Sequence, residues 1–270
     1  MHAYYINNLK PDTTYKIWVK VKDQAGNEAL YTPETYTTPI NRDEVKEYIE
    51  LTTKNSTVTL TIITANQEDR KWVWIDLNGN KKWDKDIDVP ATLGEDTYSL
   101  KAGTFRIYGK VTYLYCNGND ISAIALHNPY LQDLSAGTNE LQSVNIPNSD
   151  NLTTLYLDKN PLTSLKLGKL PYLKKLEVEV TQLSTLALGS CPELERLVVS
   201  NTPITHLDVS ANTKLNLVSI GRYNGKGLID AALKDFVKSL HSNGGEIYLS
   251  KDQKTPEILK DLKDKKWTVK

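Results

Sequence analysis

One spacing of apolar residues recurs from residue 111 to residue 215, and it constrains the fold more than any other feature. In its clearest copy, leucines surround a single asparagine: Leu152, Leu155, Leu157, Asn160, Leu162, Leu165 and Leu167. The copies that begin at residues 131, 152, 173 and 194 are each 21 residues long, and the copy that begins at residue 111 is one residue shorter. A fixed period of this length indicates a stack of similar turns of chain.

Each copy contains a short stretch in which apolar and polar residues alternate, as in a β-strand with one buried face. Leu155 and Leu157 point to one side of such a strand, and Tyr156 and Asp158 point to the other. A single turn cannot bury this apolar ridge, whereas stacked turns bury it against each other. The pattern therefore predicts a parallel sheet along a leucine-rich repeat solenoid.

The asparagine position of the repeat changes along the chain, in the order Asn119, Asn139, Asn160, Thr181, Thr202. An inward asparagine bonds the backbone groups that a tight bend leaves unpaired. Threonine has a shorter reach, so we expect the last two turns to bend differently.

The regions outside the repeats predict a fold that is mostly β, with helices confined to the ends. Strands are expected at residues 57–64, 72–75, 97–100 and 104–108, which form a small β-sandwich that caps the first turn. After the repeats, helices are expected at residues 228–240 and 256–264, and strands at residues 246–250 and 267–269. We therefore divide the chain into a first segment at 1–39, an N-terminal cap at 40–109, repeats at 110–222 and an αβ C-terminal cap at 223–270.

The first segment combines Leu9, Pro11, Thr13 and Tyr15 with a later turn of sequence DQAGN. This pattern resembles the last strands, E to G, of a fibronectin type III domain, an immunoglobulin-like sandwich. The resemblance implies that the Tyr15 hydroxyl bonds to backbone a few residues upstream, as a tyrosine corner. Such a sandwich needs about seven strands. We expect either that the chain is a fragment of a longer precursor, which would also explain why it shows no export signal, or that the open sheet edge pairs with a second copy.

The loop after the predicted strand at 72–75 is a candidate calcium site. Its oxygen-bearing groups follow the spacing of a loop that wraps Ca²⁺, with Asp86 or Asp88 as the closing carboxylate: Asp76, Asn78, Asn80, the Lys82 carbonyl and Asp84. Lys81 stands where such a loop prefers glycine, and Ile87 stands where it prefers a glutamate. The alternative is an ordinary turn whose side chains bond their own backbone.

The outward positions of the predicted strands form a candidate ligand-binding face on the concave side. They combine tyrosines with charges of both signs: Tyr113, Tyr115, Asn117, Asp133, Tyr156, Asp158, Lys175, Glu177, Glu179 and Arg196. Tyrosine supplies a large, rigid contact area with a polar tip, as at many interfaces. A solvated sheet face with polar and aromatic β-formers is the alternative.

Several functions are disfavoured by composition. The 33 basic and 33 acidic residues balance, which argues against nucleic acid as a partner. No apolar run approaches the roughly 18 residues that span a bilayer. The two cysteines, Cys116 and Cys191, fall in different turns and predict no disulfide. The scattered histidines and the absence of nucleophile and phosphate-loop motifs predict a protein that is not an enzyme.

Four stretches together resemble a family of surface leucine-rich repeat proteins of anaerobic gut bacteria. They are IYGKVTYLYCNGNDI, WIDLNGN, THLDVSANT and the terminal KKWTV, within residues 45–270. The resemblance implies a secreted or lipid-anchored protein, outside the cell or on its surface, that acts in adhesion or recognition.

We therefore expect a recognition module that binds a protein partner through its concave face. Glycan binding is the alternative, with the tyrosines and Trp83 stacking on sugar rings. A third hypothesis is a spacer that displays an upstream domain.

Overall fold

The computed structural model describes residues 6–223 and 225–270, so residues 1–5 of the predicted first segment lie outside the described residues. The chain separates into two compact units, Met1–Val45 and Lys46–Lys270. In both units β-strands are the main regular secondary structure. No helix in the described residues is long and apolar enough to cross a membrane.

The first unit contains four short antiparallel strands. β1 pairs with β4 and β2 pairs with β3, and the strands span β1 Thr14–Ile17, β2 Lys20–Lys22, β3 Glu28–Leu30 and β4 Glu34–Thr37. The hydroxyl oxygen of Tyr15 accepts a hydrogen bond of 2.8 Å from the backbone N–H of Lys10. This is the bond that the tyrosine corner requires, although the fibronectin resemblance itself stays a prediction. A one-turn 3₁₀ helix, η1 Arg42–Glu44, ends the unit.

A ten-stranded sheet is the main element of the second unit. Its eight parallel repeat and C-terminal strands follow one another in sequence order, and β6 and β9 extend the sheet at one end by antiparallel pairing. In spatial order the strands are β9 Gly94–Ser99, β6 Thr57–Thr64, β11 Val111–Tyr115, β13 Asp133–Ser135, β15 Thr154–Tyr156, β17 Lys175–Glu177, β18 Arg196–Val198, β19 Leu217–Ser219, β20 Gly245–Tyr248 and β21 Trp267–Val269.

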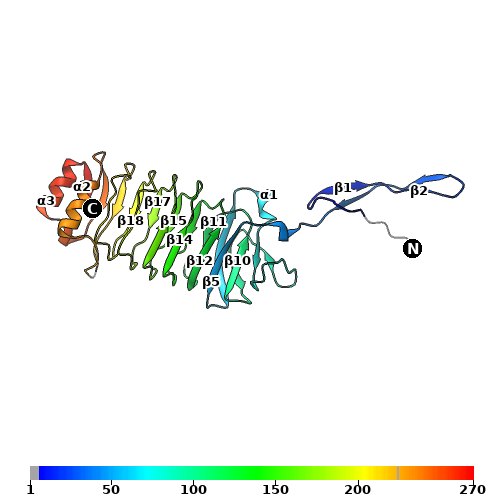
Figure 1. The fold of residues 1–270 in the computed structure, drawn as a ribbon, viewed down its shortest axis with the longest axis horizontal. Coiled ribbons are helices and arrows are strands. Elements are labelled where there is room, and N and C mark those ends of the chain that lie inside the picture. Colours follow the sequence, from blue (N-terminus) through cyan, green and yellow to red (C-terminus); the bar gives the residue numbers. More distant parts are fainter. Residues whose placement is uncertain (1–5, 224) are drawn as a thin grey trace. The chain divides into compact units, whose positions relative to one another are not determined.

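Two smaller sheets accompany it. One is antiparallel, in the order β12 Ile121–His127, β5 Tyr48–Thr53, β10 Thr104–Tyr108, β7 Trp74–Asp76 and β8 Val89–Pro90. The other is a parallel pair, β14 Ser143–Ile146 and β16 Ser164–Leu167. The helical elements are α1 Gln67–Arg70, α2 Asp230–Ser239, η2 Lys251–Gln253 and α3 Pro256–Asp264. Figure 1 shows the repeat strands side by side, with α2 and α3 beyond β18.

Paired strands explain why the repeat has a 21-residue period. Leu155 lies opposite Leu176, and Leu176 lies opposite Leu197, each step being 21 residues. All three leucines are 0% exposed. Identical inward residues therefore stack directly on each other and form one continuous core, as the alternation predicts. Cys116 and Cys191 are also buried, and both are free thiols.

The expected elements outside the repeats are observed with shifts of a few residues at most. β6 and β10 have the predicted bounds, and α3 does too. β7 begins two residues later than predicted, and β9 begins three residues earlier. Because β6 and β9 pair into the repeat sheet, part of the predicted N-terminal cap continues the same sheet surface.

Candidate ligand-binding face

The outward side chains of the repeat strands form rows, because the parallel strands pair without a shift. The first row contains Tyr113, Asp133, Thr154, Lys175 and Arg196. The second row contains Tyr115, Ser135, Tyr156, Glu177 and Val198. Backbone bonds between successive turns align a third row just past the strands: Asn117, Gly137, Asp158, Glu179 and Ser200. All ten residues predicted to bind a ligand thus lie on one face, which we call the strand face.

Strands outside the repeats extend the strand face in both directions. Tyr113 lies opposite Ile63 of β6, and Ile63 is 37% exposed. On the other side, the second row continues through Ser219 to Tyr248 of β20. The sequence analysis missed these residues. The alternation in residues 57–64 predicts a strand there, but nothing in it identifies β11 as the pairing partner.

A hollow of about 400 Å³ lies on the strand face over β13. We call it the tyrosine hollow, and its lining includes Tyr115, Asp133, Ser135, Thr154, Tyr156 and Lys175. It forms because the two tyrosines flank the small Ser135 in the second row. The sequence contains both tyrosines, but only the pairing of β13 between β11 and β15 shows that they face each other across one strand.

Charge is distributed unevenly along the strand face. Arg196 donates from Nε to Oε1 of Glu177 at 2.7 Å. Burial raises the pKa of Glu179, and the nearby carboxylates of Asp158 and Glu177 raise it further. The acidic side chains are thus concentrated beside the later turns. A ligand that spans the strand face therefore contacts the tyrosines of the early turns and the carboxylates of the later turns.

Electrostatics also connect the members of the tyrosine hollow. Burial raises the pKa of Tyr115, and the negative charge of Asp133 contributes next. Burial and then Glu177 raise the pKa of Tyr156, and Asp133 adds a smaller contribution. Both phenol hydroxyls therefore lie within the electrostatic range of one carboxylate.

The Asp76 loop is closed by side chains that accept backbone N–H groups. Asp76 is fully buried, and its two carboxylate oxygens accept from the N–H groups of Asn80 and Lys81. The carboxylate of Asp88 accepts from the N–H groups of Leu77 and Asp84. Three further bonds of the same kind run from Asn80, Lys82 and Asp86 to the side chains of Asn78, Asn80 and Asp84. This is the bonding of an ordinary turn.

The same loop concentrates negative charge, which is what a cation site requires. Burial raises the pKa of Asp88, and the charges of Asp76 and Asp84 raise it further. Among the described residues, no group of three or more His, Cys, Asp or Glu side chains is placed to hold a metal. Calcium binding therefore stays a prediction. Trp83 contacts the buried Trp74 edge-on, with ring centroids 5.5 Å apart, and neither indole lines the tyrosine hollow.

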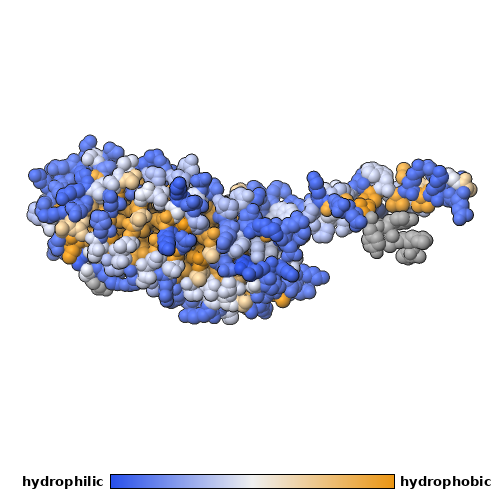
Figure 2. Space-filling model, in the orientation of Figure 1, coloured by the Kyte–Doolittle hydropathy of each residue, from blue (hydrophilic) through white to orange (hydrophobic). Residues whose placement is uncertain are grey.

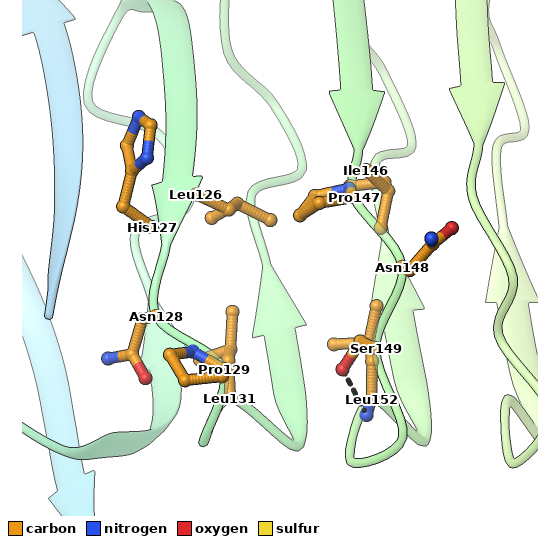
Figure 3. A pocket seen from close by; sticks show the side chains of 10 residues that line it. All are labelled: Leu126, His127, Asn128, Pro129, Leu131, Ile146, Pro147, Asn148, Ser149 and Leu152. Carbon is orange, nitrogen blue, oxygen red and sulfur yellow. Dashed lines mark hydrogen bonds between the residues drawn. The ribbon is translucent and has the colours of Figure 1, made fainter.

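A second, apolar pocket of about 220 Å³ lies between the ends of β12 and β14 (Figure 3). Leu126 and Ile146 approach it from these two strands, and Leu152 lies on the turn below. Polar side chains that line it form hydrogen bonds within the protein. For example, Ser149 accepts from the N–H of Leu152, and Asn128 donates to the carbonyl of Gly109. Figure 2 shows hydrophobic residues in a band across these turns.

Comparisons with known proteins are sparse. No protein-family model matches the chain, and no curated protein matches it. Among solved structures, a match is found to the functional domain of InlJ from Listeria monocytogenes, which is described as including a cysteine ladder. The identity is 22% and the TM-score 0.43, over 52% of this chain and 29% of that chain. The match thus spans less than a third of the InlJ chain, and at this similarity it adds nothing to the argument about function.

Proposed function

We propose that the chain is a non-catalytic recognition module of a secreted or cell-surface protein, and that the strand face binds a protein partner. The observation that carries the proposal is the alignment of all ten predicted residues in three rows on one sheet. Tyrosine and arginine are enriched at binding hot spots, and a parallel sheet holds them in fixed positions.

The second half of the strand face supports a charged contact with such a partner. Glu177 and Arg196 form a pair that stays partly exposed, with side-chain exposures of 20% and 38%. Complementary charges at an interface increase the association rate and disfavour wrong partners, and they make binding sensitive to salt. We expect the partner to contact this pair directly.

The test is binding of the purified chain to an array of purified extracellular matrix proteins, comparing wild type with Arg196→Glu. We expect a specific partner whose affinity falls at least tenfold in the variant, because the change places two like charges at the contact. Lys166→Glu is the matched control, since Lys166 is exposed on β16 and makes the same charge change away from the strand face. Equal loss in both variants, or no bound protein at all, would contradict the proposal and favour the spacer hypothesis.

Calcium binding by the Asp76 loop is part of the proposed function. Asp76 and Asp88 supply buried carboxylates, with exposures of 0% and 3%, and Asp84 lies close enough to influence the ionisation of Asp88. Hard cations such as Ca²⁺ prefer this set of oxygen ligands. Repeating the binding array in calcium chloride and in EGTA tests in the same experiment whether partner binding depends on calcium.

A further inference from the structure

The tyrosine hollow has a tyrosine on each side and a small residue between them. Ser135 of β13 lies in register with Tyr115 on one side and Tyr156 on the other. Neighbouring strands lie about 4.8 Å apart, so the two tyrosines project from positions roughly 10 Å apart. Ser135 is followed by Gly137 in the next outward position, and any Cβ there would collide with the Asp158 carboxylate. The strand between the two aromatic rings therefore carries only small side chains beyond Asp133.

The polar groups of the hollow have unused hydrogen-bonding capacity. Within the described part of the chain, the carboxylate of Asp133 and the ammonium of Lys175 form no ion pair or side-chain hydrogen bond. The hydroxyls of Tyr115, Tyr156 and Thr154 are also without a partner among the described residues. By contrast, Ser135 donates to Asn117, and the neighbouring Lys174 pairs with Glu195 at 3.0 Å.

These groups select a class of ligand by its charge. One unpaired carboxylate and one unpaired ammonium cancel, so neither a strong anion nor a strong cation gains from the hollow as a whole. An apolar ligand would leave both charges and three hydroxyls without hydrogen bonds, which is costly. The favoured ligand is neutral and carries many hydroxyl groups that both donate and accept.

The side chains of Tyr115 and Tyr156 add a second requirement, namely that the ligand is flat and has apolar faces. A pyranose ring meets both requirements, because its C–H groups form apolar faces and its hydroxyls project around its edge. The volume of about 400 Å³ falls within the range typical of small-ligand sites, about 300–1,000 Å³. We infer that the tyrosine hollow binds a neutral hexopyranose residue of a glycan, held between Tyr115 and Tyr156. This goes beyond the proposed protein recognition and does not depend on it.

The direct test is saturation-transfer difference NMR of the full chain with four methyl glycosides: those of glucose, galactose, mannose and N-acetylglucosamine. We expect saturable binding of at least one of them. Tyr115→Ala and Tyr156→Ala should each weaken it about five- to tenfold, the range expected for loss of one aromatic stacking contact. Tyr248→Ala is the matched control, since Tyr248 is 40% exposed and occupies the same row of the same sheet, on β20. Tyr248→Ala should leave the affinity unchanged.

A variant that changes the preference of the hollow between a neutral and an anionic glycoside gives a result that general damage to the fold would not produce. The wild-type hollow should bind methyl glucoside better than methyl glucuronoside, because the charges of Asp133 and Lys175 cancel and the uronate loses hydration without a net attraction in return. Asp133→Asn keeps the size of the side chain and leaves Lys175 as the one charged lining residue without an ion pair among the described residues, since Lys174 pairs with Glu195, so the glucuronoside should then bind at least as tightly as the glucoside. The inference is overturned if no glycoside binds the folded wild-type chain, if both tyrosine variants bind normally, or if Asp133→Asn leaves the preference unchanged. Because Arg196 lies outside the hollow, Arg196→Glu should spare sugar binding, so failure of either proposal is recognised separately.

Discussion

In both the asparagine turns and the threonine turns of the repeat, a buried side chain bonds the backbone groups at the bend, but the two kinds of side chain form different hydrogen bonds. The Nδ2 group of Asn160 donates to the carbonyls of Leu157 and Asp158 in its own turn and to that of Ala136 in the preceding turn. Its Oδ1 atom accepts from the N–H of Leu141, which also belongs to the preceding turn. Asn139 bonds in the same manner to Cys116 and Ile121 of the turn before it.

Among the described residues, the threonine side chain at the equivalent position bonds only within its own turn. The hydroxyl of Thr181 donates to the carbonyl of Val178 at 2.9 Å, and the hydroxyl of Thr202 donates to that of Val199 at 2.8 Å. Both side chains are as deeply buried as the asparagines. The later turns thus keep the bond that closes the bend but lose the side-chain bridge to the preceding turn.

The bend itself is shared by both kinds of turn. The residue before the asparagine or threonine has a left-handed backbone in every copy, with φ between 52° and 67°: Gly118, Thr138, Lys159, Val180 and Asn201. At this residue the two kinds of turn are thus alike, and they differ in the side-chain bridge to the preceding turn and in the second strand, which the asparagine turns carry as β12, β14 and β16 and the threonine turns, all of whose residues are described, lack. In a repeat protein the coupling between neighbouring turns determines how cooperatively the turns unfold.

Removing one bridging asparagine should have the largest effect. Asn160→Ala deletes four hydrogen bonds and leaves buried backbone groups without partners, so we expect the free energy of unfolding to fall by roughly 3 kcal/mol or more. Denaturant unfolding measures the loss, and hydrogen exchange should show faster exchange at the Leu141 amide. Asn145→Ala, at an exposed position of β14, should change the free energy by less than about 0.5 kcal/mol. A similar loss in both variants would show that the bridge does not matter.

The extent to which sequence predicts these features follows from the repeat itself. The 21-residue period determines that Lys175 lies beside Arg196 and that Leu155 stacks on Leu176, because identical turns pair without a shift. The shorter reach of Thr181 and Thr202 is also predictable from side-chain length. The expected difference in bending is not seen at the residue before each of them, since Val180 and Asn201 have the same left-handed φ as the earlier copies.

The features that sequence did not predict depend on contacts that do not repeat. The antiparallel pairing of β6 with β11 joins strands about fifty residues apart, and no period relates them. The tyrosine hollow depends on the small Ser135 between two aromatic neighbours, and the apolar pocket depends on how the ends of β12 and β14 are placed. Period identifies which residues align, but the shape of the surface follows from the few positions where one copy differs from the next.

A smaller effect is expected when the threonine hydroxyl is removed. Thr181→Val keeps the branched shape and deletes one hydrogen bond, so the free energy of unfolding should fall by about 1–1.5 kcal/mol. Thr202→Val should give the same result, because its bond has the same geometry. Denaturant unfolding of both threonine variants and of Asn160→Ala measures the three losses of unfolding free energy on one scale. If the threonine variants lose as much stability as Asn160→Ala, the bridge between turns is not the source of the difference.

The smallest expected effect is a gain, and it tests whether the shared bend is under strain. Val180 has φ of 55° and is 42% exposed, yet a β-branched residue strongly disfavours the left-handed region. Asparagine tolerates this region and occupies it at position 201 in the next copy. We therefore expect Val180→Asn to raise the free energy of unfolding by roughly 0.5–1 kcal/mol, as the melting temperature in a thermal scan would show. Asn201→Val should produce the opposite change, and Lys159→Asn a smaller gain, because lysine is not branched at Cβ. If Val180→Asn is neutral while Asn201→Val is destabilising, the left-handed backbone at Val180 is not strained, and the two threonine turns differ from each other at this bend.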